Sequence, residues 1–472
     1  MKLLICSVVT LSMMLLAMTA LAAQQALAAP AVLPFPVTST VDDIDDNPGN
    51  GLCHTDPLGP AAGLCTLRAA VMEANRTSGP GANIMLPAGI YTLTISADVA
   101  DNDNKGDMNL TTPASGNPLI MIIGAGAGST IIDGQLLDRV FHVESGRTAT
   151  ISGVTIRGGN ASSGGSGGGI LNFGSLTVSN TTIRGNSAVS SGGGIRNEGT
   201  LVLTNSTLSL NDADTGGGIS NRGPLTLIQS TIGGNTAGYG GGISNGGPLT
   251  VIQSTISDNF AILDGGGINN AGSLFLVNST LSGNNADGDG GGIFNAFTAN
   301  VYNTTILGNG ADFDRDVNGG SAGGVYNFSG ATFNLLNTLI AGNTVGNAPV
   351  YDECTGTLNS YGRNLIGLSG EGGLCTVNQI TGGGHPPLNS QYTLGPSQNN
   401  GGPTWTIALL RGSNAIDAGD PNSGCTDYNG DTIPTDQRGA ARAVDGNLDG
   451  VARCDIGAYE YRPPLYLPLI RQ

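Results

Sequence analysis

An alternation of oxygen-bearing side chains near the C-terminus is the clearest sign of chemistry in the sequence. The segment Asp445-Gly-Asn447-Leu-Asp449-Gly450 has carboxylate or amide oxygens at positions 1, 3 and 5 and glycine at position 6, like the first half of an EF-hand loop. The glutamate of position 12 is missing, because Ile456 stands there. We therefore predict Ca²⁺ as a cofactor, with Asp445, Asn447, Asp449 and Asp455 as its ligands. The alternative is an ordinary loop, because Asp and Asn also hydrogen-bond their own backbone in turns.

Cysteines are the second group that could do chemistry. Of the seven, Cys6 lies in the apolar N-terminal segment, and the other six fall into local pairs: Cys53/Cys65, Cys354/Cys375 and Cys425/Cys454. An even number at short spacing favours disulfides in an exported chain. Six cysteines allow 15 connectivities, of which we favour the local one. Metal–thiolate sites are the weaker interpretation, because the sequence has no C-x-x-C.

Catalytic groups are not visible. A glycoside hydrolase needs two carboxylates roughly 5–10 Å apart, and the repeated part of the chain has few and scattered ones: Glu198, Asp212, Asp214, Asp258, Asp264, Asp287 and Asp289. The three histidines lie outside that part, and Lys105 is the sole lysine after Lys2. The arginines Arg157, Arg184, Arg196 and Arg222 are best interpreted as scattered surface residues. Catalytic residues therefore stay unknown, and the balance is against an enzyme.

A repeat of 24 or 25 residues must position whatever site exists. The string Gly-Gly-Gly-Ile-x-Asn recurs with its isoleucine at 170, 195, 219, 243, 268 and 293, and a degenerate copy with Val325 follows after 32 residues. Fixed periods of this size indicate stacked structural repeats. Aligned copies share three amide columns that begin at Asn172, Asn180 and Asn186, and aliphatic columns that begin at Ile170, Val178 and Ile183.

These columns predict an all-β, right-handed, single-stranded parallel β-helix. Each repeat forms one coil, with aliphatic columns facing inward and stacking at about 4.8 Å per coil. We expect the amide columns at the corners, where they can adopt left-handed backbone and hydrogen-bond to the same residue one coil away. An outward threonine column (Thr182, Thr207, Thr231, Thr255, Thr280, Thr305) predicts a hydroxyl ladder that stabilises a strand.

The flanks of the repeat complete the domain organisation. Residues 1–28 have the lysine, apolar run and Ala-Leu-Ala site of a signal peptide. We predict an N-terminal cap at 29–79, with a short amphipathic helix at Thr66–Asn75. The β-helix is expected at 80–345, with regular coils at 167–345. Final coils and a disulfide-bearing C-terminal cap follow at 346–462, then a tail at 463–472.

Several segments carry a family resemblance. Cys65-Thr-Leu-Arg-Ala-Ala70 resembles the CSLREA motif of exported bacterial β-helix proteins, with Thr66 in place of Ser and Ala69 in place of Glu. The strings 415–420, 436–439 and 454–460 resemble the choice-of-anchor Q domain, and the glycine-rich coils resemble the repeats of chlamydial polymorphic outer-membrane proteins. The resemblance implies a pectin-lyase-like β-helix exported to the cell surface or outer membrane, and it implies no defined reaction.

Composition narrows the function further. The net charge of −17 argues against a nucleic-acid partner, and no stretch after the signal peptide is long and apolar enough to span a membrane. We therefore predict a monomeric, secreted or cell-surface protein with a structural, adhesive or glycan-binding role, whose partners are polysaccharides or cell-envelope components. The alternative is a lyase or hydrolase that acts on acidic polysaccharide with Ca²⁺.

Overall fold

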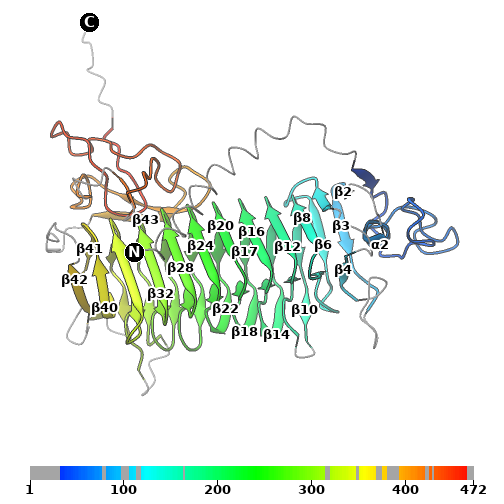
Figure 1. Ribbon diagram of the computed structural model, residues 1–472, viewed down its shortest axis with the longest axis horizontal. Coiled ribbons are helices and arrows are strands. Elements are labelled where there is room, and N and C mark those ends of the chain that lie inside the picture. The colour runs from blue at the N-terminus through cyan, green and yellow to red at the C-terminus, as the bar shows by residue number, and fades with distance from the viewer. Residues whose placement is uncertain are drawn as a thin grey trace, which may run out of the picture.

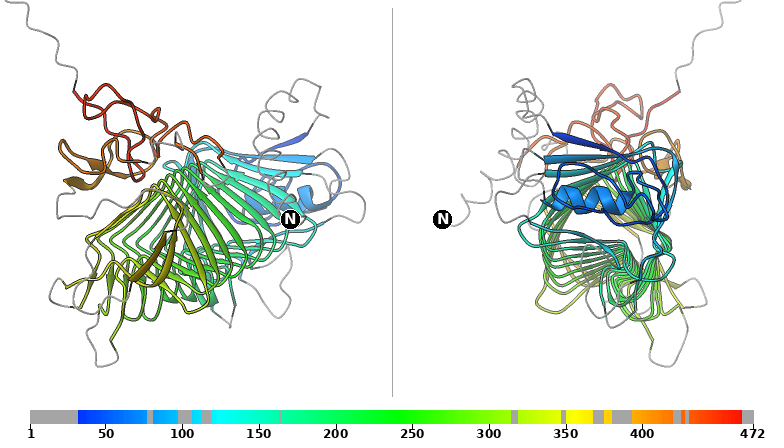
Figure 2. Two further views of the ribbon diagram at one scale, coloured as in Figure 1. Left: turned by 60° about the vertical axis from the view of Figure 1, so that its left-hand side comes forward. Right: turned by 90° about the vertical axis from the view of Figure 1, so that its right-hand side faces the viewer.

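The computed structural model describes residues 32–76, 81–96, 106–112, 119–162, 165–313, 319–346, 350–367, 375–379, 393–419, 425–427 and 430–464. The predicted signal peptide, Lys105, His385 and most of the predicted tail therefore lie outside the described residues. The described chain winds into a parallel β-solenoid, shown from the side in Figure 1 and nearly along its axis in the right panel of Figure 2.

Each regular coil contributes one strand to each of four sheets, which we call A to D, in the chain order B, A, C, D. Sheet A contains β1 (Leu33–Pro36), β2 (Gly81–Leu86), β5 (Leu119–Gly124), β8 (Thr148–Ser152), β12 (Ser175–Ser179), β16 (Thr200–Thr204), β20 (Leu225–Ile228), β24 (Pro248–Ile252), β28 (Ser273–Val277), β32 (Thr298–Tyr302), β36 (Thr332–Leu336), β40 (Cys354–Ser360) and β42 (Cys375–Gln379). Sheet B contains β4 (Met108–Leu110), β7 (Phe141–Val143), β11 (Ile170–Asn172), β15 (Ile195–Asn197), β19 (Ile219–Asn221), β23 (Ile243–Asn245), β27 (Ile268–Asn270), β31 (Ile293–Asn295) and β35 (Val325–Asn327). The two sheets join at β40, which pairs with both β35 and β36.

The other two sheets close each coil. Sheet C contains β3 (Gly89–Thr92), β6 (Thr130–Asp133), β9 (Thr155–Arg157), β13 (Thr182–Arg184), β17 (Thr207–Ser209), β21 (Thr231–Gly233), β25 (Thr255–Ser257), β29 (Thr280–Ser282), β33 (Thr305–Leu307), β37 (Leu339–Ala341) and β41 (Leu365–Ile366). Sheet D contains β10 (Asn160–Ala161), β14 (Ser187–Ser191), β18 (Asp212–Thr215), β22 (Thr236–Tyr239), β26 (Phe260–Ala261), β30 (Asn285–Ala286), β34 (Gly310–Ala311), β38 (Thr344–Val345) and β39 (Val350–Tyr351), of which β38 and β39 pair antiparallel.

The register follows the sequence columns. Ile195 pairs with Ile219, and both side chains are fully buried, as is the rest of the isoleucine column. The aliphatic columns of sheets A and C are buried as well, so one continuous apolar core runs along the axis. Glycine is required where sheet D turns into sheet B, because a Cβ on Gly194 would lie 2.6 Å from the carbonyl oxygen of Gly218 in the next coil. The predicted parallel β-helix is confirmed.

Each amide column has one of the two predicted roles, which are left-handed backbone and hydrogen bonding between coils. The column that begins at Asn180 adopts left-handed backbone at every regular coil, with φ from 46° to 50°. The columns that begin at Asn172 and Asn186 form buried ladders, in which each side-chain amide donates to the amide oxygen one coil on, as from Asn211 to Asn235 at 2.9 Å. A carboxylate ends the second ladder, because Asn343 Nδ2 donates to Glu353 Oε2 at 2.7 Å.

The N-terminal end of the core is covered by a helix, as predicted. Helix α2 (Leu67–Arg76) begins after Thr66, whose hydroxyl accepts a hydrogen bond from the backbone N–H of Ala69. Leu67, Val71 and other apolar residues of the helix join the core of the solenoid. Arg68 is fully buried, because its guanidinium pairs with Asp42 at 2.7 Å. Figure 2 shows α2 lying across this end of the coils.

The C-terminal module, defined as the described residues between 393 and 464, folds back against the flank of the later coils (Figure 1). It contains the hairpin β43 (Leu394–Gln398) and β44 (Thr406–Leu409), and its remaining chain is largely irregular. Its contacts run along sheet C and the neighbouring corner, since Thr404 and Gln437 bond to the coil at 253–255 and Ala458 to Thr305. The C-terminal segment that was predicted to be a cap therefore forms a module that lies against a side of the solenoid.

Three hydroxyls of the threonine column bond to this module. Thr255 Oγ1 donates to the carbonyl of Trp405, Thr280 Oγ1 donates to Gln437, and Thr305 Oγ1 accepts from the backbone N–H of Ala458. In the later coils these hydroxyls therefore hold the module, and the predicted stabilisation of the strand by the column stays a prediction.

Candidate functional site

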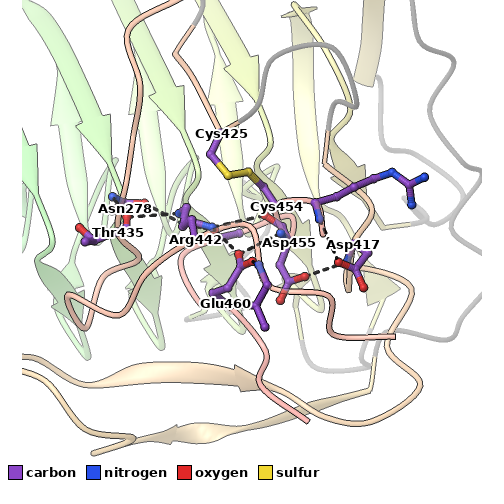
Figure 3. The surroundings of a disulfide bond; sticks show 11 residues. Asn278, Asp417, Cys425, Thr435, Arg442, Cys454, Asp455 and Glu460 are labelled. Atoms are coloured by element: carbon purple, nitrogen blue, oxygen red, sulfur yellow. Dashed lines mark hydrogen bonds and ion pairs between the residues drawn. A yellow bond between two sulfur atoms is a disulfide. The ribbon is translucent and has the colours of Figure 1, made fainter. Parts of the chain in front are cut away.

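The structure forms the three disulfides that the local spacing favours. Cys53 is joined to Cys65, Cys354 to Cys375, and Cys425 to Cys454. The first lies just before α2, the second ties two adjacent strands of sheet A, and the third holds the C-terminal module together. Figure 3 shows the third beside a cluster of buried charged residues.

Three of the predicted calcium ligands lie in one exposed turn. The carboxylate of Asp445 accepts the backbone N–H groups of Asp449 and Gly450, and Asn447 Oδ1 accepts that of Asp449. Asp449 in turn accepts the N–H of Val451 at 2.8 Å. The turn therefore has the geometry of the alternative interpretation, in which Asp and Asn bond their own backbone.

The fourth predicted ligand, Asp455, lies elsewhere in the same module. It is fully buried, and its two carboxylate oxygens accept the backbone N–H groups of Asp417 and Tyr461. Within the residues that the structure describes, no three histidine, cysteine, aspartate or glutamate side chains form a group that could hold a metal ion. Asp445, Asp449 and Asp455 therefore do not converge, and calcium binding stays a prediction that rests on the turn alone.

Asp455 belongs instead to a buried charged cluster with Arg442 and Glu460 (Figure 3). Arg442 Nη1 lies 3.4 Å from Glu460 Oε2, and Arg442 Nη2 donates to Asn278 of the solenoid at 2.7 Å. Burial, reinforced by Glu460, raises the pKa of Asp455 to about 8. Burial also lowers the pKa of Arg442, against the opposing effect of Glu460. Because these groups are enclosed and bonded to one another, we assign them to docking of the module.

A more accessible surface lies on the outside of sheet B. One residue per coil points outward there, and the strand register aligns these residues in a single column: His142, Leu171, Arg196, Ser220, Ser244, Asn269, Phe294 and Tyr326. At about 4.8 Å per coil the column is roughly 34 Å long. We call this surface the B face.

Aromatic side chains gather at both ends of the B face. At one end His142 packs against Phe173, with ring centroids 5.7 Å apart. At the other end Phe294 stacks on Tyr326 at 5.2 Å and contacts Phe328 at 6.5 Å. Three phenylalanines that follow strands of sheet B, where the chain turns toward sheet A, are exposed: Phe173 by 44%, Phe297 by 55% and Phe328 by 51%.

The middle of the B face is polar, and two of its residues are buried there, since Arg196 is 6% exposed and Ser220 3%. Arg196 pairs with Glu198 and donates from Nη1 to the hydroxyl of Ser220 at 2.6 Å. Arg222 lies 3.7 Å from the same glutamate. The four arginines expected as scattered surface residues are indeed apart, because Arg157 and Arg184 belong to sheet C, but Arg196 is buried.

Two carboxylates lie beside the end of the B face that carries Phe294 and Tyr326. Asp264 accepts the backbone N–H of Asp289 at 2.9 Å, and Asp289 accepts that of Ser321 at 2.8 Å. Burial raises the pKa of Asp289, and the charges of Asp264 and Asp352 raise it further. The pKa of Tyr326 is raised by burial and by the same two aspartates, Asp289 and Asp264. Asp264 and Asp289 are therefore a candidate acid–base pair within the described part of the regular coils.

Sequence reasoning did not single out the B face. The signal was present, because the residue after each repeat isoleucine falls in one alignment column. That column changes from histidine through arginine, serine and asparagine to aromatic residues, so no constant residue type marked it.

Comparison with known proteins gives no evidence about function. No protein-family model and no curated protein matches the sequence. Among solved structures, pectate lyase Pel9A is similar at 15% identity and a TM-score of 0.46, over 92% of this chain and 98% of that chain. A match at this level carries no argument about activity, and the parallel β-helix stands on the strand register described above. No helix within the described ranges is long and apolar enough to cross a bilayer.

Proposed function

We propose that the protein is an exported β-helix protein of the cell surface or extracellular space that binds glycans through the B face without cleaving them. The observation that carries the proposal is the B face itself, where exposed aromatic rings flank a polar strip on a rigid sheet. Exposed apolar side chains gathered in one place, with polar groups around them, are typical of ligand-binding surfaces.

The chemistry of the B face suits sugar rings. A pyranose ring has apolar C–H faces, which can pack on aromatic rings such as Phe297 and Phe328, and hydroxyls at its edge. Hydroxyls can bond to the side chains that are at least partly exposed in the middle coils, which supply both donors and acceptors: Glu198, Arg222, Ser244 and Asn269. Because the column is roughly 34 Å long at ~4.8 Å per coil, a polymer could contact the aromatic end and the polar middle at the same time.

Export is supported by the three disulfides, which form and persist in oxidising compartments. The N-terminal segment predicted as a signal peptide agrees with the same destination. Adhesion or a structural role in the envelope would follow from glycan binding by a long rigid body.

The alternative is a polysaccharide lyase or hydrolase. The observation in its favour is the pair Asp264 and Asp289 beside Tyr326, because one carboxyl with a raised pKa next to another is what glycoside hydrolysis uses. The same experiment can separate the two functions.

The experiment measures retention and cleavage together. The mature protein is run through gels that contain acidic or neutral glycans, with and without EDTA, and the glycans are then sized for cleavage. We expect retention on at least one glycan, no shortening of the polymer, and loss of retention in a Phe297→Ser/Phe328→Ser variant. Phe313→Ser is the matched control, because Phe313 is 53% exposed and follows β34 of sheet D, outside the B face. Shortening of any polymer that Asp289→Asn abolishes would establish the enzyme instead, and equal loss in the control would exclude the B face.

A further inference from the structure

A cavity of about 680 Å³ lies between the last coil and the C-terminal module, away from the B face. Leu365 of β41 contributes from the solenoid, and Ile416, Asn447 and Tyr461 contribute from the module. Two arginines line it as well, Arg363 after β40 and Arg411 after β44. The volume is within the range of small-ligand sites, about 300–1,000 Å³.

The two arginines differ from most others in the chain. Arg68, Arg157, Arg196, Arg438, Arg442 and Arg453, among others, pair with carboxylates. In the described part of the chain, neither Arg363 nor Arg411 has an ion pair or a side-chain hydrogen bond, and Arg363 Nε is buried without a partner. This is unexpected in a protein that has 35 acidic and 18 basic residues.

Few acidic side chains line the cavity, so the positive charges of the two arginines are only partly balanced. Its single acidic lining residue is Asp417. The carboxylate of Asp417 accepts the backbone N–H of Asn447 at 2.7 Å and that of Arg453 at 3.3 Å, so both of its oxygens are already engaged. The cavity therefore has two guanidinium groups against one carboxylate, and neither guanidinium group is bonded to that carboxylate.

We propose that this cavity binds a ligand of monosaccharide or disaccharide size that bears an oxyanion, a carboxylate or a phosphate. The planar guanidinium group presents paired N–H donors that match such an anion. Ile416 and Tyr461 supply apolar surface for the body of the ligand. The site is independent of the B face, so it does not rest on the proposed glycan binding there.

The test compares three probes that share one sugar ring: glucuronate, glucose 6-phosphate and glucose. Binding to the full mature chain is measured by isothermal titration calorimetry in low salt. We expect saturable binding of glucuronate or glucose 6-phosphate, and binding of glucose at least about tenfold weaker, because hydrogen bonds to charged groups are worth about 1.5–3 kcal/mol. The two anionic probes identify whether a carboxylate or a phosphate is preferred.

Variants locate the site. Arg363→Gln and Arg411→Gln should each weaken anion binding about tenfold or more, and Arg411, being exposed, can be replaced without disturbing the fold. Arg184→Gln is the matched control, because Arg184 is exposed and unpaired on β13, about 34 Å away along the axis at ~4.8 Å per coil. The proposal is overturned if no probe binds saturably, if glucose binds as tightly as the anions, or if the control variant loses as much affinity.

Discussion

Glu353→Gln is expected to stabilise the last coils above pH 7, although it removes a carboxylate that accepts three hydrogen bonds. Glu353 is buried at the end of an asparagine ladder, where its oxygens accept the N–H groups of Gly342 at 2.8 Å and Asn343 at 3.1 Å, and Asn343 Nδ2 at 2.7 Å. Burial nevertheless outweighs these bonds and raises its pKa from 4.5 to about 7. The group is therefore protonated when folded at pH values where the unfolded chain is ionised.

The sign follows from proton linkage. A carboxyl whose folded pKa is raised contributes stability that is fully present below about pH 4.5 and is lost as the pH rises to about 7. Between pH 5 and pH 8 the loss is about 2.5 kcal/mol for this shift. Glutamine does not ionise, but its amide nitrogen cannot accept a hydrogen bond, so the N–H of Gly342 or the donors of Asn343 lose their acceptor. The variant should therefore be about 1–2 kcal/mol less stable than the wild type at pH 5 and about 1 kcal/mol more stable at pH 8.

The assay is urea unfolding of both proteins at pH 5 and pH 8, with amide hydrogen exchange at residues 339–343 as a local readout. Subtracting the variant from the wild type removes the contributions of Asp455 and the other buried carboxyls, which are the same in both proteins. Glu353→Ala is the control for the ladder, because it leaves three buried donors without an acceptor and should cost about 3–6 kcal/mol at either pH. A wild type that is more stable than the glutamine variant at pH 8 would refute the reasoning, since the hydrogen bonds would then outweigh burial.

Three further predictions concern the coils and the module. Asn235→Leu should lower the free energy of unfolding by about 2–5 kcal/mol, because the backbone N–H and Nδ2 of Asn211 both donate to Asn235; a loss below 1 kcal/mol in urea unfolding would contradict the ladder. Asn205, at φ 48°, should tolerate glycine but lose about 1 kcal/mol as alanine, and equal melting temperatures of the two variants would argue against left-handed backbone there. Replacing Cys425 and Cys454 by serine should destabilise the C-terminal module by about 3–4 kcal/mol, seen as earlier proteolysis of that module alone; an unchanged rate of cleavage would show that the disulfide does not constrain it.

The coils could be predicted because one translation repeats every contact. Once Ile195 and Ile219 are aligned, all residues between them acquire neighbours one coil away, so the period alone specifies the register, the core and the ladders. The split between the amide columns could not be predicted, because asparagine and glutamine suit both left-handed backbone and ladder bonding. The structure decides it through the direction of each side chain.

The sites could not be predicted from the sequence, because each is formed by contacts between distant segments that do not repeat along the chain. Gln437 bonds to Ser254 and Thr255 across more than 180 residues, and no period in the sequence relates them. Arg363 and Arg411 likewise come from different segments of the chain and share only a cavity. Calcium binding was predicted from a local sequence motif. The structure shows that Asp455, the predicted ligand outside the turn, belongs to the buried cluster with Arg442 and Glu460.

The position of the C-terminal module is determined by apolar residues rather than by the hydroxyls it bonds. The threonine column offers similar hydroxyls in the early coils, at Thr182 and Thr207, so hydroxyls alone cannot select the later ones. At the last residue of each regular sheet A strand, however, the outward side chain changes along the register: Ser179, Thr204, Ile228, Ile252, Val277, Tyr302 and Leu336. The last three pack with Ile433 of the module in a separate apolar cluster. Docking on the early coils would leave Ile433 against serine and threonine and would expose Val277, Tyr302 and Leu336 to water, so the hydrophobic contact selects the coils and the hydrogen bonds then align the module on them.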